Sequence, residues 1–184
     1  MHKSFNEIAK HGVFLDVDGV GVLLSGQSGV GKSELALGLI SRGHRLVADD
    51  SVILTVDSNQ LVGRCPDLLQ DFLEVRGLGI LNIRAMFGDA SIKEEKLLQL
   101  IINIIQVDQE ELYLIDRLYG MHDIRHILDV PVPEVSIPVA PGRNLAILVE
   151  AAVKNHLLKI TGYHASEDFT QRHQKFMQRE QNDK

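Results

Sequence analysis

The chain has 184 residues, of which 45% are apolar and 24% charged, close to the mix of an average globular domain. Its length predicts one domain, and its composition excludes a disordered chain, a fibrous repeat and a disulfide scaffold. The net charge of −6 argues against nucleic acid or an anionic membrane as the main partner, and the single cysteine is typical of a cytoplasmic protein.

The first fifty residues alternate apolar runs with glycine-containing turns. Asp18-Gly19 lies between two apolar runs, which is a strong signal for a β-hairpin. Gly43 follows a helical pattern at the position where glycine commonly ends a helix. The elements expected here are a hairpin of strands 13–17 and 20–24, a helix over 34–42 and a short strand over 45–48.

The rest of the chain predicts a strand-rich middle followed by helices. Three prolines, which lack an N–H group, predict that strand 127–139 lies at an edge or rim of its sheet. Asn144 is expected to cap the helix that follows it. The order predicts an α/β fold with a strand-rich core, in one domain over residues 1–184. The expected elements are a hairpin of strands 52–56 and 61–63, a short helix over 67–72, strands over 97–107, 112–115 and 127–139, and helices over 145–158 and 166–184.

Residues 26–33, Gly-Gln-Ser-Gly-Val-Gly-Lys-Ser, match the pattern G-x-x-x-x-G-K-[ST] between a predicted strand and a predicted helix. Glycines at such positions let successive backbone N–H groups turn towards phosphate oxygens. Lys32 can neutralise phosphate charge, and Ser33 can ligate Mg²⁺. The alternative is a glycine-rich turn with an incidental Lys-Ser pair. The candidate phosphate-binding residues are Gly26, Gln27, Ser28, Gly29, Val30, Gly31, Lys32 and Ser33.

Asp49 and Asp50 follow the predicted strand 45–48 and are candidates for the carboxylates that phosphoryl transfer requires. Adjacent residues at a strand end point to different sides, so one can face a metal and the other an acceptor. A turn-forming pair of aspartates is the alternative. Glu74 is either a second metal ligand or a solvated strand residue, and the sequence favours neither alternative.

Three basic side chains are further candidates. His11 precedes the first hairpin and could be a base or an electrostatic partner, although a lone histidine more often has a structural role. Arg117 and Arg143 could clamp a phosphate, although most arginines are solvated surface residues.

In chain order, these stretches resemble the catalytic domain of HPr kinase/phosphorylase. The Glu-x-Arg-Gly-x-Gly stretch at 74–79 and the Gly-Arg-Asn stretch at 142–144 are the distinctive ones, and the likeness covers about residues 5–170. The matching stretches are residues 11–12, 26–33, 43–50, 73–79, 116–118, 131–133 and 138–146.

The resemblance implies an ATP-dependent protein-serine kinase that acts on the phosphocarrier HPr and regulates carbon metabolism. It also implies the reverse reaction, in which inorganic phosphate removes the phosphate from HPr and pyrophosphate is released. Ser33 and Glu74 would bind Mg²⁺, and Asp50, beside Asp49, would exchange the serine proton. The remaining implied site residues are His11 and Arg117 in the active site, Arg76, Gly77 and Gly79 for both reactions, and Pro138, Gly142 and Arg143 for phosphorolysis.

The resemblance further implies a homo-hexamer with its C-terminal helix near the HPr-docking surface. The N-terminal domain that many members carry is expected to be absent from this chain. Two other readings remain. A P-loop kinase of another small substrate would usually carry an arginine-rich lid, and a nucleotide-dependent regulatory switch would need no acceptor base such as Asp50.

Overall fold

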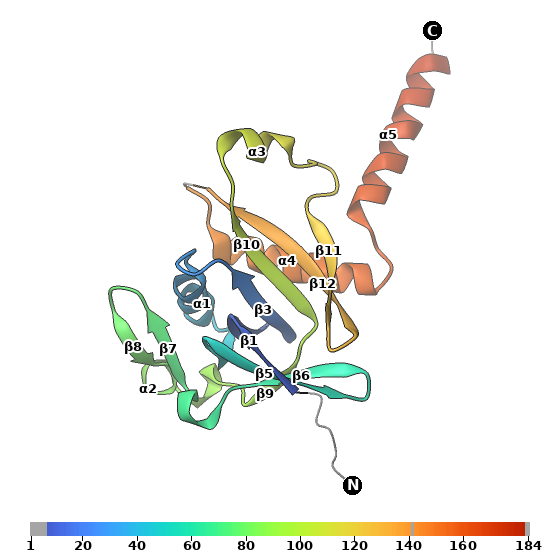
Figure 1. The fold of residues 1–184 in the computed structure, drawn as a ribbon. Helices are drawn as coiled ribbons and strands as arrows, with labels where there is room; N and C mark the ends of the chain where they lie inside the picture. The colour runs from blue at the N-terminus through green and yellow to red at the C-terminus, as the bar shows by residue number, and fades with distance from the viewer. Residues whose placement is uncertain (1–6, 141, 183–184) are drawn as a thin grey trace.

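A six-stranded sheet with the order β11-β12-β10-β3-β2-β4 forms the middle layer of the structure (Figure 1). The structure is a computed structural model and describes residues 7–140 and 142–182. The strands are β1 (Glu7–His11), β2 (Val13–Val17), β3 (Val20–Gly26), β4 (Arg45–Ala48), β5 (Ser51–Asp57), β6 (Gln60–Arg64), β7 (Phe72–Val75), β8 (Gly79–Asn82), β9 (Glu95–Leu97), β10 (Leu100–Gln106), β11 (His122–Ile127) and β12 (Val130–Val139). The helices are α1 (Lys32–Ile40), α2 (Ile83–Phe87), α3 (Gln109–Leu114), α4 (Leu145–Ile160) and α5 (Ala165–Asn182), with short 3-10 turns at Asp67–Leu69 and Asp89–Ser91.

The middle sheet has a hydrophobic core on each face. Val13, Leu15 and Val17 of β2 pack with buried residues of α1 and α4 on one face. Phe14 of the same strand packs with residues of β5 and β6 on the other face, where the antiparallel sheet β1-β5-β6-β9 lies. This alternation follows from the two-residue period of a strand and explains why β2 is apolar almost without interruption. The fold is therefore α/β with a strand-rich core, as the sequence predicts.

Both hairpins expected from turn residues are present. β2 and β3 pair around Asp18 and Gly19, which have φ angles of 50° and 83°. β5 and β6 pair around Ser58 and Asn59, with φ angles of 50° and 62°. Two-residue turns with positive φ match the twist of the strands they join, so these registers are set locally.

The expected strand over 112–115 is wrong, because residues 112–114 belong to α3 and Ile115 is its C-cap. Asp108 caps the helix by accepting the backbone N–H of Glu111, and Glu111 accepts the N–H of Asp108 in return. This capping box outweighs the apolar run that suggests a strand. The expected strand over 97–107 is two strands, β9 and β10, and the expected helix over 67–72 is only a 3-10 turn before β7.

Most of the expected strand over 127–139 is β12, which forms a hairpin with the preceding β11 and lies inside the sheet rather than at its edge. β11 pairs with residues 130–135 of β12, and β10 pairs with residues 134–139. The Ser136 N–H donates towards the β11 side, to the Met121 carbonyl. The nitrogens of Pro131 and Pro133 therefore face the β10 side before β10 pairing begins, and that of Pro138 faces the β11 side after β11 pairing ends. Each missing N–H falls where no neighbouring strand needs it.

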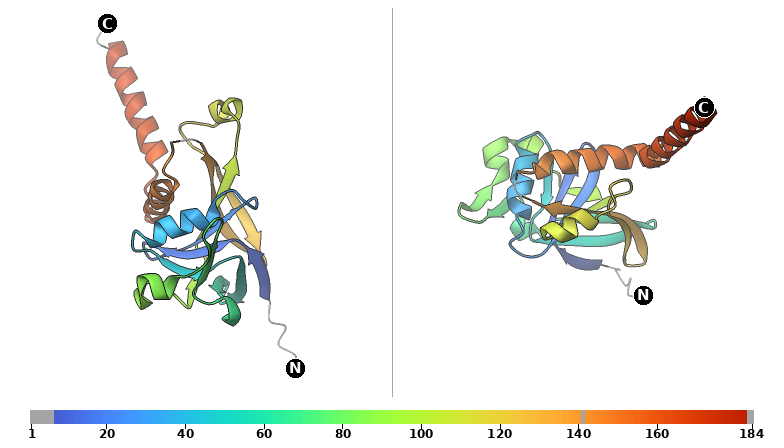
Figure 2. Two further views of the ribbon diagram at one scale, coloured as in Figure 1. Left: turned by 90° about the vertical axis from the view of Figure 1, so that its left-hand side faces the viewer. Right: turned by 90° about the horizontal axis from the view of Figure 1, so that it is seen from above.

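The two C-terminal helices follow the sequence closely. α4 begins after Asn144, whose side chain accepts the backbone N–H of Ile147 at 3.3 Å. α5 extends away from the layered body (Figure 2) and leaves Phe169 and Phe176 more than half exposed. The expected end of this helix at 183–184 lies outside the described residues. Among the helices that the structure describes, none combines the length and apolar character needed to cross a membrane.

Candidate active site

The phosphate loop, residues 26–33, connects β3 to α1, as the sequence pattern predicts. Gly26 lies against β10, and a Cβ there would stand 2.3 Å from the carbonyl oxygen of Ile104. Gly29 and Gly31 have φ angles of 79° and 98°, which glycine adopts without strain. Val30 is buried in the core under α1 and anchors the loop. The residue types in the loop are therefore compatible with its backbone conformation.

Lys32, the first residue of α1, is 93% buried inside the loop. Its Nζ donates to the carbonyl oxygens of Gly26 at 3.0 Å and Gln27 at 2.9 Å. The ammonium group is therefore held where the backbone curves around it, beside the positive end of the α1 dipole. This concentration of positive potential suits an anion such as phosphate.

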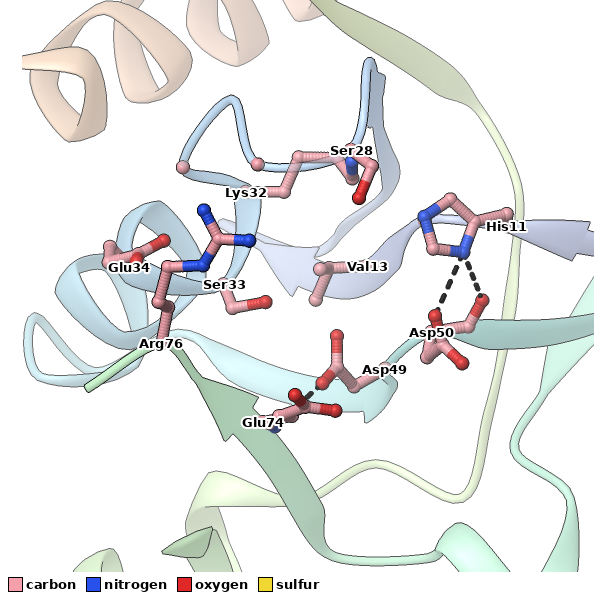
Figure 3. A pocket seen from close by; sticks show the side chains of 13 residues that line it. His11, Val13, Ser28, Lys32, Ser33, Glu34, Asp49, Asp50, Glu74 and Arg76 are labelled. Carbon is pink, nitrogen blue, oxygen red and sulfur yellow. Dashed lines mark hydrogen bonds and ion pairs between the residues drawn. The ribbon is translucent and has the colours of Figure 1, made fainter. Parts of the chain in front are cut away.

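Asp49 and Asp50, between β4 and β5, point in different directions, as expected (Figure 3). The Asp49 Oδ2 accepts the backbone N–H of Glu74 at 2.8 Å. Asp49 is only 8% exposed, and this burial raises the pKa of its carboxyl above the ordinary value. A nearby cation would offset the cost of ionising this buried group.

The Asp50 side chain points away from that of Asp49 and is paired with His11 (Figure 3). The His11 Nδ1 is 2.9 Å from Asp50 Oδ1 and 3.0 Å from the Asp50 carbonyl oxygen. Asp50 has a φ of 62°, which turns the chain between the two strands. Both side chains are more than half exposed, so the pair is open to a large reactant.

Glu74 and Arg76 come from the region of β7, where buried and exposed residues alternate. Leu73 and Val75 enter the core, so Glu74 and Arg76 project from the other face. The Arg76 guanidinium lies over the phosphate loop, with Nη1 3.5 Å from the position that a Cβ on Gly29 would take. Gly77 and Gly79 do not line the cavity. Gly77 lies in the turn into β8 and Gly79 is the first residue of that strand, with φ angles of 88° and 83°.

One cavity of about 190 Å³, here called the phosphate-loop cavity, gathers most of the predicted residues (Figure 3). Gly12, Val13 and Glu34, which are not among the predicted site residues, also line it. Gly12 carries a readable signal, because glycine before a strand often marks a close approach, and a Cβ there would lie 2.5 Å from the Leu24 carbonyl oxygen. The predicted residues in the cavity are His11, Ser28, Gly29, Gly31, Lys32, Ser33, Asp49, Asp50, Glu74 and Arg76.

Arg117, Pro138 and Arg143 line a different cavity, of about 550 Å³, beside α3. Gly142 has a φ of 80° in the turn before α4, and residue 141 of the same predicted segment lies outside the described residues. The structure therefore brings two predicted arginines together, but not with the phosphate loop.

The donor set for a divalent cation consists of the Ser33 hydroxyl and the carboxylates of Asp49 and Glu74, which all line the phosphate-loop cavity. Among the described residues, no group of three histidine, cysteine or carboxylate side chains forms a complete metal site. Mg²⁺ usually takes only one or two protein carboxylates, with water and substrate phosphates completing its octahedron. The residues present fit that mode of binding.

The chain resembles known proteins over most of its length. The sequence model of the family described as HPr Serine kinase C-terminal domain matches residues 3–173. The HPr kinase/phosphorylase of Neisseria meningitidis serogroup C is 56% identical over 166 residues, which are 90% of this chain and 52% of that protein. The HPr kinase/phosphorylase of Chromobacterium violaceum is 51% identical over 173 residues, which are 94% of this chain and 54% of that protein. The chain thus spans about half the length of the curated relatives it matches.

A solved structure has the same fold. The Hpr(Ser) kinase/phosphatase from Coxiella burnetii superposes with a TM-score of 0.79 at 38% sequence identity. The superposition covers 88% of this chain and 98% of that chain. The arrangement of layers around the phosphate loop is therefore shared with a solved kinase structure.

Proposed function

Because the chain belongs to the HPr serine kinase C-terminal domain family, we propose that it is an ATP-dependent protein-serine kinase acting on HPr, and that it also runs the reverse phosphorolysis. Membership of this family implies that the chain uses a nucleotide. The observation that carries the proposal is one cavity in which the phosphate loop lies beside an exposed His11–Asp50 pair. Such a cavity combines a binding site for phosphate with a base for a hydroxyl acceptor.

The phosphate loop holds the phosphates of ATP, with Lys32 balancing their charge. Arg76 reaches the loop from the opposite wall and adds a second positive charge. Ser33 and Glu74 hold Mg²⁺, which supplies neutralisation of phosphate charge when bound. The nearby Asp49 carboxylate is a further candidate ligand.

Asp50 accepts the proton of the HPr serine while the serine oxygen forms a bond to the γ-phosphorus. The bond from that phosphorus to the bridging oxygen breaks, and ADP leaves. In the reverse reaction an oxygen of inorganic phosphate attacks the phosphoserine phosphorus. Asp50 then returns its proton to the departing serine oxygen, and the new P–O–P link makes pyrophosphate. His11 holds Asp50 in place in both directions.

The exposure of the base favours a protein acceptor over a small metabolite. The side chains of His11 and Asp50 are 59% and 69% exposed. Small-substrate kinases gain specificity and exclude water by enclosing the acceptor, whereas a serine on a protein surface can reach an open base. A regulatory switch without chemistry would have no use for a base in this position.

The other expectations from the resemblance stay predictions. They comprise ATP and Mg²⁺ as the particular cofactors, inorganic phosphate and pyrophosphate as co-substrates, a homo-hexamer, a cytoplasmic location and one domain over residues 1–184. The roles of Arg117 and Arg143 also stay predictions, since these residues lie beside α3 rather than on the phosphate loop.

The experiment is incubation of the purified chain with ATP, Mg²⁺ and HPr, followed by phosphate, with mass spectrometry of HPr at each stage. We expect one added phosphate, then its loss with formation of pyrophosphate. A panel of small hydroxyl metabolites is the control for the rival kinase reading. Phosphorylation of a metabolite with unmodified HPr would overturn the proposal, and so would ATP binding without any transfer.

A further inference from the structure

A second cavity, of about 500 Å³, lies between the β11–β12 hairpin and α4, and is here called the β12–α4 cavity. It shares no residue with the phosphate-loop cavity. Its size falls in the usual range for small-molecule sites. Much of its wall is apolar: Leu100, Ile124, Pro133, Val135, Ala151 and Ala152.

Three basic side chains, Lys159, His122 and His156, line the same cavity. The Lys159 Nζ is 3.3 Å from the His122 Nε2, which acts as acceptor in the neutral imidazole. Within residues 7–140 and 142–182, Lys159 forms no ion pair with a carboxylate. Burial and the nearby ammonium lower the pKa of both histidines. A lysine whose partner is a neutral imidazole keeps its positive charge largely uncompensated.

Neither carboxylate on the wall, Glu134 or Asp123, forms an ion pair with Lys159 within the described residues. Glu134 is paired with Arg125, with Nε 2.6 Å from Oε2 and Nη2 2.9 Å from Oε1. The Asp123 Oδ1 accepts the backbone N–H of Ile124 at 2.7 Å. The cavity therefore presents, beside an apolar wall, an ammonium that no described carboxylate contacts.

We propose that the β12–α4 cavity binds a small organic anion, with a carboxylate or phosphate on Lys159, His122 and His156 and an apolar body against the alanines of α4. The anion replaces the weak lysine–imidazole contact with charge-assisted hydrogen bonds. It also favours the protonated form of each histidine, so binding and protonation reinforce each other.

The probes are hexanoate and hexyl phosphate, with hexan-1-ol as the neutral match, added to the full chain. The NMR signals of the His122 and His156 rings report on the cavity. We expect saturable shifts of both signals with an anion and none with the alcohol at equal concentration. Tighter binding of hexyl phosphate would identify a phosphate ligand, and tighter binding of hexanoate a carboxylate.

Two substitutions separate this site from general charge effects. Lys159→Gln should weaken binding by about tenfold or more, which corresponds to one charge-assisted contact. Lys154→Gln, on the same helix but outside the cavity, should leave it unchanged. Ala152→Leu should abolish binding by filling the cavity, with circular dichroism confirming the fold.

Several results would overturn the proposal. They are equal binding of hexan-1-ol, equal loss in the two lysine variants, unchanged binding in Ala152→Leu, or no saturable shift with either anion. Ring signals that move on dilution and ignore both anions would show that a second copy of the chain covers the cavity, which also overturns it.

Discussion

The Nδ1 of His11 contacts both the carboxylate and the carbonyl oxygen of Asp50, at 2.9 and 3.0 Å. The histidine is the last residue of β1, and it lies opposite Ser51, the first residue of β5 and the residue directly after Asp50. The ladder between β1 and β5 therefore fixes where the exposed carboxylate can point. The exposed carboxylate that we propose as the base is thus positioned by a sheet rather than by burial.

Replacing Asp50 with Asn should remove the base while keeping its shape. We expect serine phosphorylation and phosphorolysis to fall by about 10²–10⁴-fold, the usual contribution of general acid–base catalysis. ATP affinity should change little, because Asp50 does not touch the phosphate loop. Rates of transfer to HPr and ATP titrations measure the two effects. Asp57→Asn, at the exposed end of β5, is the matched control. Full transfer activity in Asp50→Asn would contradict the assignment of the base.

Replacing Lys32 with Met should weaken nucleotide binding by more than about tenfold, because the substitution removes a buried charge inside the loop that we propose to bind phosphate. Titration with ATP and with ADP measures the effect. Lys154→Met, on the exposed surface of α4, should bind both nucleotides normally. Affinity in Lys32→Met equal to that of the unaltered chain would count against phosphate binding by this loop.

Replacing Asp49 with Asn should stabilise the fold at neutral pH and impair Mg²⁺-dependent transfer. Burial raises the pKa of the Asp49 carboxyl in the folded chain, so ionisation is costlier there than in the unfolded chain. As the pH rises from the unfolded pKa through the folded one, the unaltered chain loses stability relative to the variant. The gap is then constant at higher pH. The asparagine oxygen can still accept the Glu74 N–H.

Urea unfolding of the unaltered chain and of Asp49→Asn, at pH 3 and pH 7 without Mg²⁺, measures this difference in stability. We expect the variant to be more stable than the unaltered chain at pH 7 and to differ little from it at pH 3. The opposite result would be a variant that loses stability relative to the unaltered chain between pH 3 and pH 7. That result would show that the surroundings stabilise the ionised carboxylate.

Two glycine-to-alanine substitutions should have opposite effects on stability. A Cβ on Gly21 would meet the Leu97 carbonyl carbon at 2.9 Å, so β3 and β9 would have to separate, at a cost of roughly 1–3 kcal/mol. Gly38 lies inside α1, and its Cβ would meet nothing closer than 4.0 Å. Gly38→Ala should therefore stabilise the chain by about 0.5–1 kcal/mol. Thermal unfolding of both variants measures the two changes in stability. If both variants were stabilised, or both destabilised, the packing described around these glycines would be wrong.

Features that depend on neighbouring residues in the chain could be predicted from the sequence. The turn at Asp18-Gly19 and the phosphate loop are specified within a few residues, and both are present. The capping box of α3 was also readable, since Asp108 and Glu111 have the required spacing, but the apolar run 112–115 obscured it. Local signals conflicted there, and the helix cap was the stronger one.

Features that depend on distant contacts could not be predicted. The hydrogen bond from Glu74 to Asp49 requires β7 to lie beside the end of β4, and nothing near either residue specifies that approach. Arg76 reaches Gly29 for the same reason. The edge position expected for the proline-containing strand failed because its two neighbours cover different halves of it, which a single strand's sequence does not reveal.

The divided pairing of β12 has a consequence for local unfolding. β11 and β10 share only Glu134 and Val135 as common partners on β12, so the two ladders are almost independent. The exposed β11 hairpin can open and reclose, with its amides exchanging, while the half of β12 beside β10 keeps its hydrogen bonds. Motion at that outer strand is thereby separated from β10 and from β3, the strand that carries the phosphate loop.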